Sequence, residues 1–394
     1  MAKLSGIRVL DLSRFLAGPY CTALLADLGA EVLKIEPPQL GDDTRHIGPF
    51  KNGESVYFAL INRGKKSLTL NLKHPEALTA FYELVREADV VVENFRPGVA
   101  RRLGVDYASL KAVNPRLIYA SISGFGQDGP YAQRPAYDII AQAMSGLMSV
   151  TGHPNSGPTR VGESLGDLCA GLFAAWAICA ALYGRERTGC GEHLDVAMFD
   201  ALFALQVTGL SQLLAEDRVP GLVGNRHPLS TPFDTYRASD GLVVIAVANE
   251  PLFARLAALL GRPELPADPR FASDSARTAH EPELRAVIEA WTGVRSVAEV
   301  CAACEAAGIP ASPVWDLRQA AESVQARARG LVTPVDHPAI GPLGLVGQPV
   351  KFTEEPAAAP ACAPNLGDST TAILAERLGY TPARIQALRQ AGAI

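Results

Sequence analysis

The hydrophobic pattern of the first 150 residues alternates between short apolar runs and longer amphipathic segments. The short runs are apolar at nearly every position, which is typical of strands buried on both faces of a parallel sheet. Strands are predicted at residues 6–13, 30–36, 67–72, 89–95 and 117–125. Helices are predicted at residues 19–29, 75–88 and 138–150. This alternation indicates an α/β fold, and we expect a Rossmann-like domain with a parallel sheet.

One uncharged segment runs from Leu168 to Tyr183 and follows a single carboxylate, Asp167. As a helix, it would extend about 24 Å, which is less than the roughly 30 Å of a bilayer core. The segment is also rich in alanine, a residue that lets helices pack closely. We therefore expect a helix buried in the core of the domain, with no association with a membrane.

Further elements follow Gly184, and the hydrophobic pattern changes from about Gly224. Residues 185–206 predict a turn, a strand and a helix, and residues 231–249 predict an antiparallel hairpin with Ser-Asp-Gly at its turn. Helices are expected at 281–292 and 297–307, and the proline-rich stretch 333–364 is interpreted as a connection before helices return at the end of the chain. The domains predicted from this pattern are a large Rossmann-like domain (1–200), a connecting helix or linker (201–224), a smaller α+β domain (225–325) and a segment that returns to the large domain (326–394).

Composition narrows the function classes. A net charge of −5 argues against a basic nucleic-acid groove, and 48% hydrophobic residues provide for a sizeable core. The seven cysteines are odd in number in a large chain, and no apolar stretch near the N-terminus resembles a signal peptide, so a cytoplasmic protein is expected. The pair Cys301 and Cys304 lies in an alanine-rich helical stretch and is interpreted as buried apolar residues, not as a redox or zinc pair.

Several patterns that suggest common chemistry lack the context they need. GFGQDG at 124–129 matches the dinucleotide fingerprint, but no helix is expected to begin before about Tyr137, so a loop that lets a ligand approach the backbone is favoured.

Glu36 ends a predicted strand without a glycine fingerprint beside it. The seven histidines show no metal-ligand spacing, and the GxSxG elbow of serine hydrolases is absent. Arg96, Arg101 and Arg102 follow a predicted strand and suit either phosphate contacts or a solvated helix start.

Asp167 begins the apolar helix and admits two interpretations. Aspartate is a preferred residue at a helix N-cap and in the first turn, so a purely structural role is open. The helix dipole and the amides of the first turn could also keep the carboxylate ionised in apolar surroundings and hold an oxyanion formed next to it. A charged, poorly hydrated carboxylate of this kind is a candidate covalent nucleophile.

Several stretches, taken in order, resemble family III CoA-transferases, the group of formyl-CoA transferase and the carnitine CoA-transferase. They are GIRVLDLSRFLAGPYCTALLADLGAEVLKIEPP, LNLKHPEA, VVENFRPG, NPRLIYASISGFGQDGPY, AYDIIAQAMSG, LGDLCAG and GCGEHLDVAMFDA, with NLGDST near the end. The resemblance implies a transferase that moves CoA between an acyl-CoA and a free carboxylate through a covalent aspartyl intermediate. It also implies a homodimer of two interlocked rings and no permanently bound cofactor or metal.

The family's nucleophilic aspartate corresponds to Asp167. Its CoA-contacting stretches fall on Phe15, Leu16, Leu70, Asn71, Leu72, Lys73, Asn94, Phe95, Arg96, Arg102, Ala136, Tyr137 and Asp138. Formyl-CoA transferase has a basic residue at two positions where this chain has Pro37 and Pro135. Two phosphate contacts of that enzyme are therefore missing here, and Arg96 or Arg102 is expected to carry more of them.

The same superfamily contains α-methylacyl-CoA racemases, in which a histidine and an aspartate move a proton. This chain has Tyr137 in the place of that histidine, and a tyrosine with an ordinary pKa near 10 is a poor proton shuttle, so transfer is favoured. A CoA-binding protein without turnover is the third possibility.

The substrates follow from two further features of the sequence. Formyl-CoA transferase has a glycine run near the start of its small domain, which this chain lacks, so an oxalate/formyl-CoA pair is not expected. The stretch GNRHPLSTPFDTYRASDG resembles relatives that take CoA from succinyl-CoA and pass it to dicarboxylic acids. The candidate residues for binding a second carboxylate are Arg45, His46 and Arg226.

Overall fold

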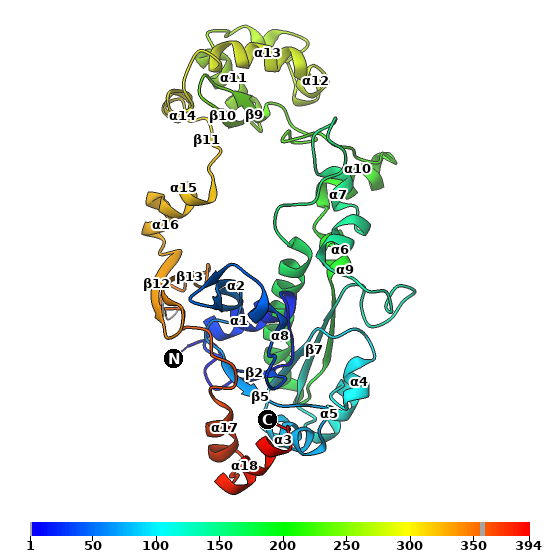
Figure 1. Cartoon of the computed structure of the whole chain (residues 1–394). Helices are drawn as coiled ribbons and strands as arrows, with labels where there is room; N and C mark the ends of the chain where they lie inside the picture. Colours follow the sequence, from blue (N-terminus) through cyan, green and yellow to red (C-terminus); the bar gives the residue numbers. More distant parts are fainter. Residues whose placement is uncertain (1, 355–358) are drawn as a thin grey trace. The chain divides into compact units, whose positions relative to one another are not determined.

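The computed structural model describes residues 2–354 and 359–394 and divides into two compact units (Figure 1). Unit 1 consists of Met1–Leu147, Val161–Gln206 and Val324–Ile394, and unit 2 of Met148–Arg160 and Val207–Ser323. The sequence assigned all of 1–200 to the large domain, whereas residues 148–160 lie in unit 2. Gly224 donates its backbone N–H to the Gly152 carbonyl (3.0 Å), and the left-handed Gly224 lies against the His153 ring.

A six-stranded sheet forms the centre of unit 1, in the order β5-β2-β1-β6-β7-β8. The strands are β1 (Arg8–Asp11), β2 (Glu31–Glu36), β5 (Lys66–Thr69), β6 (Val90–Glu93), β7 (Ile118–Ser123) and β8 (His193–Ala197). All five pairings are parallel, which confirms the α/β fold with a parallel sheet. From β1 the chain proceeds outward to β2 and β5, then returns to β6 beside β1, so the direction of strand addition reverses between β1 and β6.

Two hydrophobic clusters cover the two faces of this sheet. Leu10 and Val91 face a cluster with Phe81 and Leu374, whereas their neighbours Val9 and Val90 face a cluster with Ile178, as the period of two in a strand requires. The helices of unit 1 are α1 (Ala17–Asp27), α2 (Val56–Ile61), α3 (Pro75–Val85), α4 (Val99–Leu103), α5 (Tyr107–Val113), α6 (Asp138–Met144), α8 (Leu165–Thr188), α9 (Met198–Ala204), α16 (Val324–Ala328), α17 (Thr370–Glu376) and α18 (Pro382–Gln390). The C-terminal helices α17 and α18 complete the first cluster beside α3 (Figure 1).

Helix α8 contains the uncharged segment and packs against α1 and β7. A Cβ on Gly171 would lie 2.5 Å from the Ala17 carbonyl oxygen, so glycine is what allows α1 and α8 to approach this closely. By length and composition α8 is apolar enough to cross a membrane, as are α9 and α10 (Val207–Glu216) taken together. Part of α8 lies in the core of unit 1, where nine of its residues are buried, including Ala174, Ile178 and Arg185.

Unit 2 is built around an antiparallel sheet of three strands, β9 (Phe233–Arg237), β10 (Leu242–Ala246) and β11 (Ala311–Pro313). The hairpin predicted from the sequence is confirmed as β9–β10. The helices are α10, α11 (Glu250–Leu259), α12 (Asp274–Ala279), α13 (Glu281–Thr292), α14 (Val297–Ala306) and α15 (Leu317–Glu322), while α7 (Leu147–Val150) begins at the boundary of the units. Cys304 is fully buried in α14 and all seven cysteines are unpaired, so Cys301 and Cys304 form no disulfide.

The proline-rich stretch 333–364 is not simply a connection. It forms most of a hairpin of β12 (Val332–His337) and β13 (Gly341–Val346), and its residues 355–358 lie outside the described residues. Pro334 is tolerated because a two-stranded sheet has only edge strands, in which a missing N–H need not interrupt the ladder. A smaller hairpin, β3 (Phe50–Lys51) and β4 (Glu54–Ser55), precedes α2, and two 3₁₀ turns occur at η1 (Asp43–His46) and η2 (Leu265–Ala267).

Candidate active site

The candidate site lies at the carboxyl ends of β1, β6 and β7, where the direction of strand addition reverses. Open parallel sheets usually bind ligands at this kind of switch point. The segments that leave the three strands line a cleft of about 480 Å³, which we call the Asp167 cleft. Its lining includes Phe15 after β1, Asn94 after β6, Gly124 after β7, Tyr137 before α6 and Asp167 in α8.

Asp167 occupies the first turn of α8, three residues after the N-cap Ser164. The start of this helix is held from α6. Asp138 accepts hydrogen bonds from the Gly166 N–H and from the Gln142 side-chain amide, both at 2.7 Å, and the Gln142 side-chain oxygen accepts from Val161 N–H (2.9 Å). Asp138 and Gln142 are themselves buried, so they fix the helix start from inside the protein.

The electrostatics of Asp167 differ from the expectation. Helix amides were expected to keep the carboxylate readily ionised, but burial, with an additional contribution from the charge of Asp138, raises the pKa of Asp167 to about 7. The Gly166 N–H is also bound to Asp138, so this amide is not available for an oxyanion. A carboxylate with a pKa this high is a better nucleophile than an ordinary aspartate whenever it is ionised.

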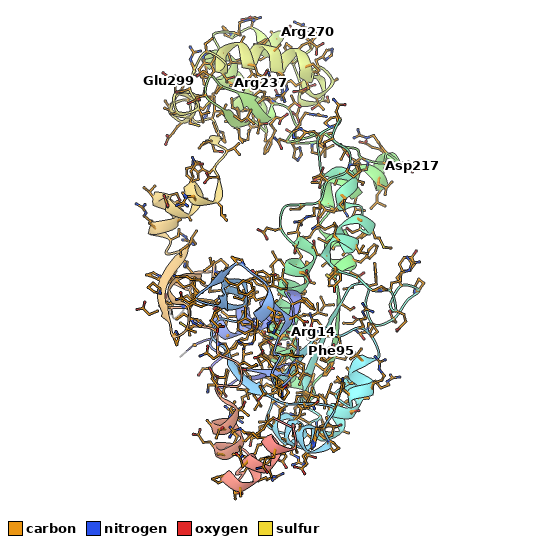
Figure 2. All side chains as sticks on the ribbon, in the orientation of Figure 1. Arg14, Phe95, Asp217, Arg237, Arg270 and Glu299 are labelled. Atoms are coloured by element: carbon orange, nitrogen blue, oxygen red, sulfur yellow. The ribbon has the colours of Figure 1, made fainter. Side chains whose placement is uncertain are left out.

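A second cavity of about 180 Å³, the Lys73 pocket, adjoins the Asp167 cleft. Arg14 and Phe95 line both cavities and lie close together in Figure 2. The pocket extends along the ends of β1, β2 and β5, and its lining includes Pro37 and Lys73. A ligand with two linked parts could therefore occupy both cavities and pass between them beside Arg14 and Phe95.

Buried charges hold the segment that follows β1. Although burial opposes ionisation, Lys65 and Lys34 hold the pKa of Asp11 well below its ordinary value, and Asp11 accepts from Ser13 N–H (2.9 Å). Lys34 in turn donates to the Ser13 carbonyl (2.9 Å). These contacts precede Phe15, which has a positive φ of 62°, a conformation that costs energy for a residue other than glycine. The network thus holds a strained residue at the wall of the cleft.

Comparison with known proteins decides the family. The family model described as CoA-transferase family III matches residues 4–370. The chain belongs to CoA-transferase family III. It is 46% identical to the acetyl-CoA:oxalate CoA-transferase of Acetobacter aceti, over 94% of this chain and 95% of that one, and 39% identical to the succinate–glutarate CoA-transferase of Agrobacterium fabrum, over 95% of both chains. It also matches the crystal structure of a CAIB/BAIF family protein from Brucella suis (39% identity, TM-score 0.84, 95% and 99% of the two chains).

The protein is therefore a CoA-transferase whose substrates are CoA thioesters. Of the thirteen residues matched to CoA contacts, eleven line one of the two cavities. Phe15, Leu16, Asn94, Phe95, Arg96, Ala136 and Tyr137 line the Asp167 cleft, and Leu70, Asn71, Leu72 and Lys73 line the Lys73 pocket with Phe95.

The remaining two residues do not line either cavity. Arg102 lies in the last turn of α4 and is exposed, and the side chain of Asp138 is turned into the protein to hold Gly166 and Gln142. The Asp138 side chain is thus a positioning group for the start of α8. The cations that do line the cavities are Arg14, Arg96 and Arg134 in the cleft and Arg14, Lys34 and Lys73 in the pocket.

The three residues suggested for a second carboxylate have different surroundings. Arg45 is bound in a bidentate ion pair to Glu36 (both contacts 2.8 Å) and stacks on Phe58, so its guanidinium is already occupied. His46 is exposed and contacts the Leu40 carbonyl (2.8 Å). Arg226 lies in unit 2 beside a polar cavity of about 390 Å³, and its buried Nη1 has no hydrogen-bond partner among the residues that the structure describes.

Sequence reasoning missed several residues of the cleft, including Tyr57, Ser123, Arg134 and Met198. Burial and the charge of Asp167 raise the pKa of Tyr57 to about 12, so its phenol stays protonated close to the nucleophile candidate. Arg134 precedes Pro135, one of the two positions where formyl-CoA transferase has a basic residue and this chain does not. Its place in the loop after β7 was a signal that could have been used.

Proposed function

We propose that the enzyme transfers CoA from an acyl-CoA to a free carboxylic acid by a ping-pong mechanism through Asp167. A carboxylate oxygen of Asp167 attacks the thioester carbonyl, the C–S bond breaks, and CoA leaves as a thiolate from a mixed anhydride. The thiolate then attacks the aspartyl carbonyl, the C–O bond breaks, the donor acid leaves and a CoA thioester remains on Asp167. The acceptor acid repeats these steps in reverse.

One observation carries this proposal. Asp167 is a partly buried carboxylate with a raised pKa, and it lines a cleft to which the segments after three parallel strands contribute. The cleft supplies positioning, which is worth roughly 7–11 kcal/mol when reacting atoms are held in near-attack geometry. Ionised Asp167 itself supplies the nucleophile.

Intact-protein and peptide masses test the covalent step. The enzyme is incubated with donor acyl-CoA and no acceptor, then quenched in acid. We expect a peptide containing Asp167 to gain the mass of one CoA less one water, and the gain to disappear after acceptor acid is added. If the protein turns over substrate but this peptide never carries an adduct, the aspartyl mechanism is wrong. A protein that binds CoA without adduct or turnover would instead be a CoA-binding protein.

For CoA itself, we propose that the molecule extends from the Lys73 pocket to the Asp167 cleft. Arg14, Arg96, Arg134 and Lys73 supply positive charge along this path, and the arginines suit bidentate contacts with phosphate. Arg134 in this arrangement replaces the basic residue that formyl-CoA transferase has at the position of Pro135. Arg134→Met should raise the Kd for CoA about ten-fold, and the loss should be smaller for 3′-dephospho-CoA if the 3′-phosphate is the group it binds.

The acid substrates are proposed to be dicarboxylates, with succinyl-CoA as the favoured donor. The relatives named for oxalate and for glutarate support a dicarboxylic acceptor. Because the oxalate relative is also named for acetyl-CoA, acetyl-CoA is the alternative donor. Oxalate thus stays among the candidate acceptors despite the missing glycine run. A panel of acids from acetate to glutarate against acetyl-CoA and succinyl-CoA, read by the mass of the CoA products, tests this. A monocarboxylate that accepts CoA at least ten-fold faster than every dicarboxylate would refute this proposal.

Arg226 is our candidate for the second carboxylate, because a buried guanidinium nitrogen without a partner is costly unless a ligand supplies one. Arg226→Lys should raise KM for the dicarboxylate at least ten-fold while leaving KM for a monocarboxylate of similar size unchanged. Equal effects on both acids would remove Arg226 from this role.

We further propose a cytoplasmic homodimer of interlocked rings. In the single chain, α8 exposes an apolar stripe at helical spacing, formed by Leu172 (56% exposed), Trp176 (68%) and Tyr183 (68%). Exposed apolar stripes of this kind usually meet a partner, and a second copy of the chain is the partner that the family resemblance implies. Seven unpaired cysteines favour a reducing compartment.

A further inference from the structure

A buried carboxylate directly behind the cleft takes no part in the chemistry proposed above. Glu93 is the last residue of β6, its exposure is 3%, and it accepts a hydrogen bond from the Phe95 N–H (2.7 Å). Phe95 lines both the Asp167 cleft and the Lys73 pocket. The side chain of Glu93 therefore holds the backbone at Phe95. Phe95 and Arg14 are the residues that line both cavities.

Glu93 faces side chains of the neighbouring strand β7 and, beyond it, of β8. Ser121 lies opposite Glu93 in the β6–β7 register, and its hydroxyl favours the charged form of the Glu93 carboxylate. The Ser121 hydroxyl also contacts Nε2 of His193 at 2.9 Å. The His193 ring stacks on Tyr107 (5.2 Å between centroids) and meets the edge of Tyr119 (5.4 Å), so it is fixed in orientation. Glu93, Ser121 and His193 thus form a row of polar side chains across β6, β7 and β8.

The charges around Glu93 leave it close to a balance between its two protonation states. Burial raises the pKa of Glu93 to about 7, and the charge of Asp195 on β8 adds to this, whereas the Ser121 hydroxyl and the hydrogen bond from the Phe95 N–H lower it. Burial also lowers the pKa of His193 and raises that of Tyr119, which leaves both rings neutral at pH 7 and unable to stabilise the carboxylate by charge.

The other neighbouring strand, β1, has Asp11 at its end, and Asp11 is paired with Lys65 (2.9 Å). The segment after β6 is further tied to β1 by Asn94. Its side-chain oxygen accepts from the Arg14 N–H (2.9 Å) and its amide donates to the Arg14 carbonyl (2.7 Å). These two bonds join the segment that contains Phe95 to Arg14 and the strained Phe15, and both of these line the Asp167 cleft.

We infer that Glu93 is a positioning residue for CoA: its ionised carboxylate holds Phe95 and, through Asn94, the Arg14–Phe15 segment, and its protonation weakens CoA binding. The inference rests on the proposed binding of CoA along these two cavities. The physical reason is that an N–H bond to a carboxylate is about twice as strong as one to a neutral carboxyl.

The test is CoA binding by calorimetry in Asp167→Asn protein, in which the titration of Asp167 is absent. The Kd is measured between pH 6 and pH 8 with Glu93 present and with Glu93→Gln, which keeps the size and the acceptor for Phe95 but cannot ionise. The titration of the CoA phosphates is common to both proteins and cancels in the ratio of their Kd values. We expect the protein with Glu93 to lose about five-fold more affinity than the Gln variant as the pH falls from 8 to 6.

Ser121→Ala supplies an independent variant with Glu93 intact. Removing the hydroxyl takes away a polar group that favours the charged form of Glu93, so the midpoint of the affinity loss should move to higher pH. Thermal melts of the variants report any general damage, which would lower affinity equally at every pH.

Three outcomes are distinguishable. A steeper loss of affinity with Glu93 than with Gln, together with the upward shift in Ser121→Ala, supports the positioning role. Measurable CoA binding with the same pH dependence in all three proteins overturns it and leaves the proposed function intact. No CoA binding to the folded Asp167→Asn protein at any pH overturns both.

Discussion

At the scale of single residues, Asp167 and Asp138 have different surroundings, although both are carboxylates beside the start of α8. Asp167 lines the cleft, whereas Asp138 is turned inward and bonded to Gly166 and Gln142. The sequence identified Asp167 from the uncharged segment that follows it. It could not separate the ligand-facing residues from the supporting ones, because Tyr137 and Asp138 are adjacent in the chain and their side chains have opposite surroundings.

The raised pKa of Asp167 predicts an acid limb in the activity profile. Only the carboxylate attacks, so kcat should fall as the pH drops through about 7. Asp138→Asn removes the neighbouring charge that helps to raise this pKa, so the acid limb should move to lower pH. Steady-state rates from pH 5 to 9 measure the limb. An acid limb near pH 4 in the wild type, or one that Asp138→Asn shifts upward, would contradict this assignment.

At the scale of elements, the sequence predicted the sheet better than the small hairpins. Strands of the parallel sheet are apolar at successive positions and lie between amphipathic helices, so their pattern is distinctive. The β12–β13 hairpin contains Pro334 and alternates exposed with partly buried positions over only six residues, and short edge strands of this kind resemble loops in a sequence. The helix predicted at 138–150 divides at Gly146, whose φ is +91°.

The close packing of α1 on α8 is testable with two glycines of one helix. Gly171→Ala should destabilise the protein by about 1–3 kcal/mol, because the new Cβ would lie 2.5 Å from the backbone of Ala17. Gly184→Ala is the matched control in the same helix, since nothing lies within 4 Å of its Cβ position, and it should stabilise by about 0.5–1 kcal/mol. Urea unfolding measures both changes, and equal effects at the two sites would refute the packing argument.

At the scale of the whole molecule, the fold class followed from periodicity, but the site did not. The Asp167 cleft unites segments near residues 15, 57, 95, 135, 167 and 198. Their proximity depends on strand order, and no local pattern specifies that β6 lies beside β1. The family resemblance supplied most of the site residues instead. The assignment of 148–160 to unit 2 depends in the same way on long-range contacts with Gly224, which no local sequence pattern predicts.

The proposed dimer predicts a mass in solution of about twice the 41.7 kDa of the chain. Light scattering should give this value without a concentration dependence, because interlocked rings cannot separate without partial unfolding. Trp176→Glu introduces a charge into the apolar stripe of α8 and should reduce the dimeric fraction, whereas Val294→Glu changes an exposed residue (76%) of unit 2 and serves as control. A stable wild-type monomer that retains activity would contradict the proposal.

The most direct test of the central claim is turnover in variants of Asp167 that still fold and bind CoA. Asp167→Asn keeps the shape and the first-turn position but removes the anion, and Asp167→Glu keeps the anion but displaces it by one methylene. Both should bind CoA and lose more than about a thousand-fold in kcat. Glu163→Gln, which removes an exposed carboxylate four residues earlier and outside the cleft lining, should keep normal turnover. Near-normal turnover in Asp167→Asn, with deamidation back to Asp excluded by mass, would show that Asp167 is not the nucleophile.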